Sequence, residues 1–372
     1  MKKFLCAALV SVLSVSAFST VFAGEISPAT GAQPVPFSEV PGIKVGHYTD
    51  LENATGTTVI IAENPDGAIG GVDVRGGSPG TRETDLLDPT KTVQTVNAVC
   101  LTGGSAFGLD AAGGVMKYLE EKGMGVDVGV TVVPIVSTAV IFDLAMGEDA
   151  ALGKDMVRPG VEEGYKAAQN AFAGLEWSDG NIGGGTGAGA GDMKGGLGSY
   201  AYKYGDLYVG AIVVANPAGQ IINPDTGEIV AGKVDPETNS FIDLEEWTMS
   251  DRYEMPSSAE NTTIGLIVTN AKLTQSEANK LAEMAHDGYA RAIEPTHTVS
   301  DGDTIFAMSV GNVESSASTW GEVTTNMNLI GVLAVNAMEN AIYSAGYNAE
   351  SLAGVDGAAT LREEGRTPSQ PE

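Results

Sequence analysis

Cysteine and histidine are scarce in this chain. Its 372 residues include two cysteines, Cys6 and Cys100, and three histidines. Cys6 lies in a segment that we expect to be removed, so the remaining chain keeps one cysteine and cannot form an internal disulfide. No cluster of histidine, cysteine and acidic residues has the spacing of metal ligands, and we expect neither a metal nor another cofactor. The fold must therefore be held together by a hydrophobic core.

Basic residues are also few. The chain has 20 Lys and Arg against 48 Asp and Glu, which gives a formal net charge of −28. Such a charge repels phosphates and anionic lipid surfaces, so we expect no nucleic-acid partner and no membrane association of the mature protein. The acidity suits either amine-bearing substrates or solubility in a salty setting, and composition does not separate these explanations.

The chain lacks long apolar runs beyond its N-terminus. Residues 1–23 carry Lys2 and Lys3, then an apolar stretch broken by serines and one threonine, and they end in Val21-Phe22-Ala23. This pattern is typical of a cleavable secretory signal, and no lipid-anchoring cysteine follows it. We therefore predict cleavage after Ala23 and a periplasmic or secreted bacterial protein. Loss of the two lysines would change the net charge from −28 to −30.

What the chain does have is glycine, with 49 residues that imply many tight turns. Residues 24–39 are predicted to form an extended lead-in that stays mobile or drapes over a neighbouring subunit. One domain is expected over residues 40–362. Within it, the acidic, proline-containing stretch 233–260 is predicted to be an exposed linker, and residues 363–372 are predicted to be a disordered tail.

Apolar patterning predicts an alternation of strands and helices. Thr274-Gln275-Ser276-Glu277 has the pattern of a capping box, which marks the start of a helix that ends before Pro295. Further helices are expected near residues 105–119, 159–173 and 328–345. Strands are expected within residues 42–48, 57–62, 68–74, 96–101, 126–141, 200–203, 207–215, 263–270 and 305–310.

Two glycine-rich segments are candidates for a site. Residues 180–198 hold a dense tract that includes Gly184 and Gly185, and its backbone can approach a ligand or another chain closely. A flexible linker is the alternative, and we favour the site loop. Gly104-Ser105 resembles a nucleophile elbow, but Phe107 stands where that motif needs its last glycine. We therefore interpret Ser105 as a helix N-cap.

Two asparagines stand next to strands. Asn261-Thr262 directly precedes an apolar strand that would hold a threonine hydroxyl rigidly, although such a pair is more often an ordinary strand entrance. Asn216-Pro217 ends an earlier strand abruptly. The Asn216 amide could donate to an oxyanion, but capping of the following turn is the simpler role.

The order of these motifs resembles that of the self-processing L-aminopeptidase/D-esterase family, which includes β-peptidyl aminopeptidases and the nylon-oligomer hydrolase. The resemblance runs from about Gly42 to about Gly346. It implies an α/β fold, a four-layer αββα sandwich layered like the N-terminal nucleophile hydrolases but connected like ornithine acetyltransferase. The motifs that carry it are residues 100–109, the glycine tract, Asn216-Pro217, Asn261-Thr262-Thr263-Ile264 and Asp301-Gly302-Asp303-Thr304.

The resemblance also implies a cleavage. The chain would cut itself between Asn261 and Thr262 into residues 24–261 and 262–372, which stay associated, and the processed protomers would form a homotetramer. Thr262 would be the catalytic nucleophile, and its freed amine would serve as the base. Asp301 and Asp303 would orient that amine.

Other site residues follow from the same resemblance. Asn216 would belong to the oxyanion site. Lys194 is the candidate for the lysine of the threonine branch, although Asp192 stands at the position in simple register. Phe142 replaces a tyrosine that is common in the family. Phe142 is assigned to the substrate pocket together with Gly104, Ser105, Gly184 and Gly185, while His286 and His297 are interpreted as structural.

Together these features predict a secreted amide hydrolase. The favoured activity is that of an aminopeptidase acting on small peptides or amino-acid amides through an acyl-Thr262 intermediate. The alternatives are an endo-amidase for linear or cyclic oligoamides, an acyltransferase like ornithine acetyltransferase, and a cleaved but inactive binding scaffold. The scaffold alternative stays open because Phe142 replaces a tyrosine of the family and the position of the lysine is not certain.

Overall fold

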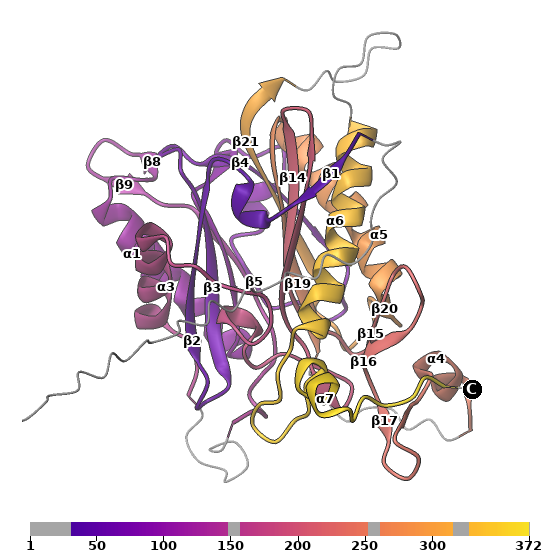
Figure 1. Ribbon diagram of the computed structural model, residues 1–372. Coiled ribbons are helices and arrows are strands. Elements are labelled where there is room, and N and C mark those ends of the chain that lie inside the picture. Colours follow the sequence, from indigo (N-terminus) through magenta and orange to yellow (C-terminus); the bar gives the residue numbers. More distant parts are fainter. Residues whose placement is uncertain (1–30, 148–156, 252–260, 315–326, 372) are drawn as a thin grey trace, which may run out of the picture.

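Two β-sheets pack face to face, and each carries helices on its outer side (Figure 1). The computed structural model describes residues 31–147, 157–251, 261–314 and 327–371. The larger sheet has seven strands, in the order β1 (Gln33–Val35), β13 (Gly196–Tyr204), β14 (Leu207–Asn216), β19 (Thr262–Lys272), β21 (Thr304–Glu314), β4 (Ala68–Val74) and β6 (Thr95–Val96).

The smaller sheet and the helices complete the layers. Helices α5 (Gln275–Ala292) and α6 (Met327–Tyr347) cover the larger sheet, while α1 (Ala111–Glu121) and α3 (Val161–Ala173) cover the smaller one. The smaller sheet has the order β2 (Ile43–Asp50), β3 (Thr55–Ala62), β7 (Ala98–Thr102), β10 (Val136–Val140) and β5 (Thr81–Arg82).

Three hydrophobic clusters lie between these four layers. One joins the larger sheet to α5 and α6, one fills the space between the sheets, and one joins the smaller sheet to α1 and α3. β19 is covered on both faces by these layers, and its residues from Thr262 to Ala271 are therefore buried. The predicted four-layer αββα sandwich is confirmed.

The start of α5 also follows its sequence pattern. The Thr274 hydroxyl accepts a hydrogen bond from the Glu277 backbone N–H, and the Glu277 carboxylate accepts one from the Thr274 backbone N–H. The predicted capping box is confirmed, and it fixes the direction in which the chain leaves β19.

Short elements connect the layers. Hairpin-like pairs are β8 (Val126–Asp127) with β9 (Val132–Val133), β11 (Gly189–Ala190) with β12 (Met193–Lys194), and β17 (Val234–Asp235) with β18 (Ser240–Phe241); β15 (Gln220–Ile222) lies between β16 (Ile229–Ala231) and β20 (Ile293–Glu294). Within the described ranges, the remaining helices are α4 (Leu244–Met249), α7 (Ala358–Glu364) and four short 3₁₀ turns at Phe37–Glu39, Asp85–Leu87, Ser105–Asp110 and Gly183–Gly185.

The prediction of a mobile or neighbour-bound lead-in is wrong for its second half. β1 pairs with β13 of the same chain, with Gln33 opposite Lys203, and the Phe37 side chain is buried. Backbone pairing at a sheet edge needs no side-chain pattern, so the Pro-rich sequence of residues 24–39 gave no sign of this strand. The predicted signal, residues 1–23, lies outside the described residues.

The linker and the tail also differ from expectation. Residues 233–251 fold into β17, β18 and α4, while residues 252–260 lie outside the described part. The tail is not disordered over residues 363–371: the Gln370 side chain donates to Ile229 O at 3.0 Å and accepts from Ile229 N at 2.8 Å. The Phe241 N–H also donates to Ser369 O. These bonds satisfy strand-edge groups that water would otherwise satisfy.

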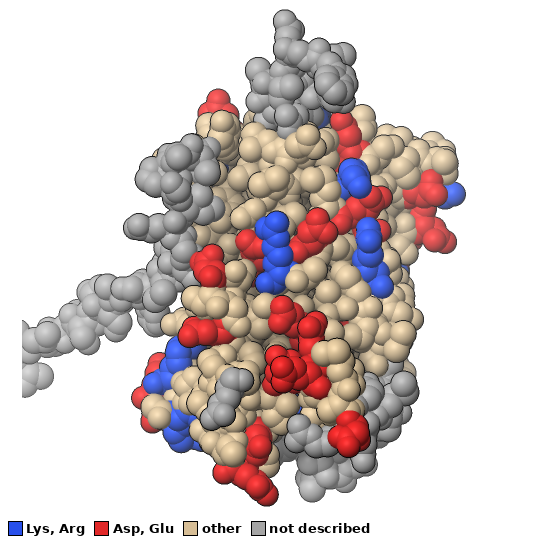
Figure 2. Space-filling model, turned by 90° about the vertical axis from the view of Figure 1, so that its right-hand side faces the viewer, with Lys and Arg blue, Asp and Glu red and all other residues tan. Residues whose placement is uncertain are grey.

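The surface reflects the charge of the chain. Figure 2 shows the side on which α4 and α5 lie, where acidic side chains gather over the middle and lower part with a few Lys and Arg among them. Of the helices in the described ranges, none combines the length and the apolar character that spanning a bilayer would require.

Candidate active site

Three strands of the larger sheet bring the predicted catalytic residues to one end of the sheet. β14 runs antiparallel to β19, and this pairing places Asn216 opposite Thr262. β19 runs parallel to β21 with Ile264 opposite Thr304, so Thr262 lies level with Gly302, between Asp301 and Asp303. The register of the central strands thus assembles residues that are far apart in sequence.

Thr262 is buried at the start of β19. Its hydroxyl donates to the carbonyl oxygen of Asn261 in a very close contact, and it accepts a hydrogen bond of 3.1 Å from the Gly302 N–H. The Asn261 side chain donates to Pro217 O at 3.1 Å. The hydroxyl oxygen therefore lies beside the peptide that precedes it, and both partners are fixed to the ends of neighbouring strands.

Asp303 connects the Thr262–Thr263 peptide to the turn that contains His297. One of its carboxylate oxygens accepts from the Thr263 N–H at 2.8 Å. The other accepts from the backbone N–H of His297 at 3.1 Å and lies 2.7 Å from His297 Nδ1. The carboxylate is buried, so these partners replace the water that a charged group otherwise requires.

Asp301 holds the other side of Gly302. Its carboxyl oxygens accept from Ala218 N at 2.9 Å and from the backbone and hydroxyl of Thr298 at 3.2 and 2.5 Å. Burial, together with the nearby charge of Asp303, raises the pKa of Asp301 to about 6. The two aspartates thus anchor the Gly302 amide that faces the Thr262 hydroxyl.

Asn216 joins Thr262 to two loops. Its side-chain oxygen accepts from Gly189 N at 2.8 Å, and its Nδ2 donates to Phe142 O at 3.4 Å. Phe142 is half-buried and follows β10. The bond from Asn216 reaches its backbone oxygen and not its ring. Asn216 therefore ties the glycine tract to the end of the smaller sheet, beyond the turn-capping role that sequence alone favoured.

Lys194 lies inside the protein and points into the glycine tract. Its Nζ donates to Thr186 O at 2.8 Å and to Ala188 O at 2.6 Å. Burial lowers the pKa of Lys194 to about 7, and the charge of Asp143 opposes that shift. Asp192, the alternative, is exposed at the tip of the β11–β12 hairpin and accepts from Val234 N. Of the two residues, Lys194 is the one whose side chain is buried, beside the segment that Asn216 binds at Gly189.

Asp143 is a site neighbour that sequence reasoning missed. Its carboxyl oxygens accept from the Thr55 hydroxyl and the Gly104 N–H, both at 2.7 Å. Burial raises the pKa of Asp143, and the positive charge of Lys194 acts in the opposite direction. An acidic residue at the end of an otherwise apolar strand was the available signal.

The glycines assigned to the substrate pocket have packing roles. Gly184 N donates to the Thr58 hydroxyl at 3.1 Å, and a Cβ at Gly185 would lie 2.1 Å from Leu197 N. Both glycines are buried between the sheets, so the ligand-facing role predicted for them is not the one their contacts give. Close approach of backbone to backbone, not to a ligand, requires glycine here.

Gly104 and Ser105 follow β7 in left-handed conformations, with φ of 86° and 52°. The 3₁₀ turn begins at Ser105 itself, and Gly104 precedes it without a side-chain cap. The interpretation of Ser105 as an N-cap is therefore wrong. Because β7 and β10 are parallel neighbours, this turn lies next to the chain that carries Phe142.

The glycine loop at residues 75–82 packs on the aspartates. Ser78 N donates to Asp301 O at 2.8 Å, and Arg75 N donates to Asp303 O at 2.9 Å. A Cβ at Gly76 would lie 2.2 Å from Asp303 N. The missing side chain at Gly76 lets this loop pack closely against the residues that hold Thr262.

His286 and His297 differ in surroundings. His286 is buried in α5 with Nε2 3.1 Å from Asp73 O, and burial lowers its pKa to about 4. It is thus neutral at ordinary pH, as expected of a structural histidine. His297 contacts Asp303 directly.

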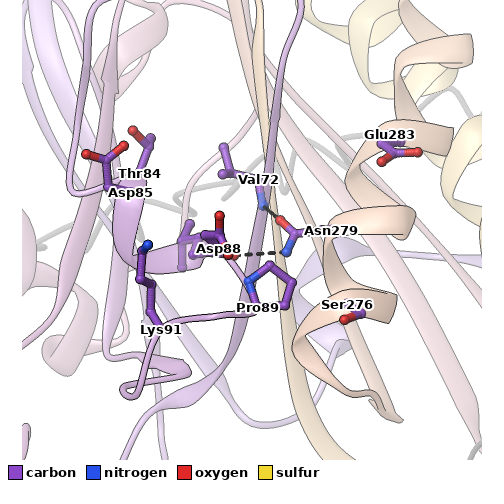
Figure 3. Close-up of a pocket in the computed structure, with 10 residues that line it drawn as sticks. Val72, Thr84, Asp85, Asp88, Pro89, Lys91, Ser276, Asn279 and Glu283 are labelled. Carbon is purple, nitrogen blue, oxygen red and sulfur yellow. Dashed lines mark hydrogen bonds between the residues drawn. The ribbon is translucent and has the colours of Figure 1, made fainter.

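A cavity of about 800 Å³ opens elsewhere, between the turn after β5 and the first half of α5 (Figure 3). Val72 and Asn279 both line it, and the Asn279 side-chain oxygen accepts a hydrogen bond of 2.8 Å from Val72 N. None of the candidate catalytic residues lines this cavity.

The layered fold defines the class to which these residues belong. A solved structure of an L-aminopeptidase D-Ala-esterase/amidase from Ochrobactrum anthropi, described as a variant of the Ntn hydrolase fold, superimposes with a TM-score of 0.61. It is 21% identical in sequence, and the match covers 89% of this chain and 94% of that one. The fold of the chain is therefore this variant of the Ntn hydrolase fold.

The chain belongs to peptidase family S58, whose model matches residues 37–360. A protein of Mycobacterium leprae, described as an uncharacterized aminopeptidase, is 41% identical over 340 residues, covering 86% of this chain and 91% of the relative. A 6-aminohexanoate-oligomer endohydrolase of Paenarthrobacter ureafaciens is 32% identical over 331 residues, covering 86% and 87%. The protein is therefore an amide hydrolase of the aminopeptidase kind.

Proposed function

We propose that the chain cuts itself between Asn261 and Thr262, and that the exposed Thr262 is the nucleophile of an aminopeptidase for small peptides or amino-acid amides. The observation that carries this proposal is the Thr262 hydroxyl, which lies against the Asn261 carbonyl while the Gly302 N–H donates to it at 3.1 Å. A hydroxyl held beside the carbonyl group that it attacks avoids much of the entropic barrier to an intramolecular reaction.

The cleavage balances as an acyl shift followed by hydrolysis. Thr262 Oγ1 attacks the Asn261 carbonyl carbon, its proton passes to the Thr262 nitrogen, and the C–N bond breaks. Water then hydrolyses the ester, leaving a carboxylate on Asn261 and a free amine on Thr262. A model α-amine titrates near pH 8, so this amine suits the role of base for its own hydroxyl.

The same groups would serve turnover. The hydroxyl attacks the substrate carbonyl, the amine product leaves, and water releases the acyl group from Thr262. Asn216 and Lys194 are the side chains we propose for the oxyanion. The ammonium form of Lys194 has three N–H donors, of which two bind Thr186 O and Ala188 O, and the third can serve developing negative charge.

A second candidate is an endo-acting amidase, favoured by the identity of 32% to a 6-aminohexanoate-oligomer endohydrolase. N-acetylation of aminoacyl p-nitroanilides separates the two. An aminopeptidase site that binds the free amine should lose at least about a hundredfold in kcat/KM on acetylation. Retained hydrolysis of the acetylated compounds, with release of internal fragments from oligoamides, would favour the endo-acting enzyme. Absence of turnover on both would favour the scaffold.

We also propose that the protein is exported and works as a homotetramer of processed protomers. The signal-like residues 1–23 support export, and the family resemblance supports the tetramer. N-terminal sequencing of protein recovered from the periplasm or medium, expected to start at Gly24, tests the first. Light scattering of the processed protein tests the second.

Self-cleavage is expected to speed up between about pH 5 and pH 7. With a pKa of about 6, the ionised fraction of Asp301 grows from about one tenth to about nine tenths over this interval. The ionised carboxylate accepts more strongly from Ala218 and Thr298, and so holds Gly302 N–H against Thr262. A time course of newly synthesised chain on gels should show a rate increase of up to about tenfold.

Asp301→Asn is the control for this dependence. The amide cannot ionise, so the rate of cleavage in this variant should be lower and flat over the same interval. An equal slope with pH in the variant and the natural protein would assign the dependence to another group.

A further inference from the structure

His297 makes an unusual double contact with Asp303. Its backbone N–H donates to Asp303 Oδ2 at 3.1 Å, and its Nδ1 lies 2.7 Å from the same oxygen. His297 has a φ of 55°, a left-handed conformation that is uncommon for residues other than glycine. The turn thus carries both donors of one residue to one carboxylate oxygen.

We assign the ring nitrogen as the donor in this contact. Both oxygens of Asp303 already accept backbone N–H groups, from Thr263 and from His297, as the oxygens of a carboxylate do. The contact therefore fixes the tautomer of His297 with its proton on Nδ1.

The ring is itself held by α5. It lies edge-on to His286, with ring centroids 4.8 Å apart, and stacks on Tyr289 at 5.8 Å. His286 faces Asp73 on the other side. The titratable groups around the His297 ring are therefore Asp303, His286 and Tyr289, with Asp73 behind His286.

The bond continues to the nucleophile. Asp303 Oδ1 accepts from the Thr263 N–H at 2.8 Å, and this N–H belongs to the peptide that follows Thr262. Gly302 precedes Asp303 in the chain, and its backbone N–H donates to Thr262 Oγ1. A shift of the Asp303 carboxylate would move both contacts.

We propose that His297 is a positioning residue for the reaction: its Nδ1–H orients Asp303, and Asp303 in turn orients the Thr262–Thr263 peptide and the Gly302 amide. This inference rests on the proposed role of Thr262. It assigns the histidine to the catalytic geometry rather than only to the fold of the turn.

The left-handed backbone offers a matched pair of variants. His297→Gly keeps the backbone conformation and removes the ring donor, whereas His297→Asn tolerates the same conformation and places an amide N–H where Nδ1 stood. The glycine variant should cleave itself more slowly and lose about ten- to a hundredfold in kcat, with KM nearly unchanged, because a hydrogen bond to a charged group is lost. The asparagine variant should regain most of that loss.

The measurements are the rate of self-cleavage, kcat and KM on one aminoacyl p-nitroanilide, and Tm for all three proteins. Support requires recovery by asparagine of both rates at a Tm close to that of the glycine variant. The inference is overturned if the two variants have equal kcat, or if the glycine variant has natural kcat. It is also overturned if the glycine variant fails only by unfolding.

Failure of the proposed function has a different signature. If the natural protein stays uncut and inactive, the role of Thr262 is wrong and the inference on His297 goes with it. If the natural protein is cut and active while His297→Gly behaves like it, only the inference fails.

Discussion

Replacing Thr262 with alanine should yield one uncut chain with no measurable hydrolysis. Thr262→Ala removes the oxygen that lies beside the Asn261 carbonyl, so neither the acyl shift nor an acyl-enzyme can form. Activity should fall by more than about a thousandfold, as expected for loss of a nucleophile. Intact mass spectrometry should show two fragments meeting at Asn261/Thr262 in the natural protein and one in the variant.

The adjacent threonine supplies the control. The Thr263 hydroxyl is buried and has no hydrogen-bond partner within the described structure, so Thr263→Val removes it at nearly constant shape. That variant should still be cut and active, because Asp303 binds the Thr263 backbone and not its side chain. An uncut natural protein, or a cut Thr262→Ala protein, would refute the assignment of the nucleophile.

Adding one methyl group at Gly302 should have the next largest effect. In Gly302→Ala the new Cβ would lie 2.8 Å from Thr262 Oγ1 and 2.7 Å from Ser78 O. Both distances are too short for carbon and oxygen, so the hydroxyl and the loop at residues 75–82 must move. A displacement of about 1 Å at reacting atoms costs on the order of a hundredfold in rate. The loss should appear in self-cleavage and in kcat.

Gly113→Ala is the matched control for this substitution. Gly113 lies in α1, and its new Cβ would be 3.6 Å from Val161, an ordinary contact. Alanine also favours a helix over glycine, so the control should fold and react normally. If Gly302→Ala matures at the natural rate, the Gly302 amide does not fix the position of the Thr262 hydroxyl.

Individual strands and helices were predictable because burial leaves a strong mark on sequence, whereas their four-layer arrangement was implied by the family resemblance. The strand from Thr262 to Ala271 is buried throughout and has an apolar run at residues 264–268, and Thr274 to Glu277 marks the start of the next helix. The edge strand Gln33–Val35 and the tail around Gln370 left no such mark. They are held by backbone groups and one amide side chain, which polar and proline-rich segments can supply without any periodicity.

Proximity of the proposed site residues was predictable where a motif implied register. The spacing of Asn216, Thr262 and the two aspartates was assigned through family resemblance, and the strand pairing brings these positions together. The position of the lysine required three-dimensional information. Asp192 lies exposed in the hairpin turn next to Gly191, which has a φ of 59°, while the Lys194 side chain is buried.

The role of a glycine was the hardest feature to predict from the sequence. The tract around Gly184 and Gly185 predicted a ligand-facing loop, because a missing side chain permits close approach of any group. The approaching groups are the protein's own strands. The partners of Asp143 and the bond from His297 to Asp303 could not be predicted either, since each depends on contacts between segments that have no fixed spacing in sequence.

The order of strands in the larger sheet has a consequence for assembly after cleavage. β19 and β21 follow the proposed cut, yet they lie between β14 and β4, which precede it. The two fragments would therefore share one continuous hydrogen-bonded sheet and could separate only by unfolding. Folding of the precursor is a reaction of one chain, but recovery of the denatured mature enzyme would require two chains to meet. Its yield should then depend on protein concentration, while that of Thr262→Ala should not.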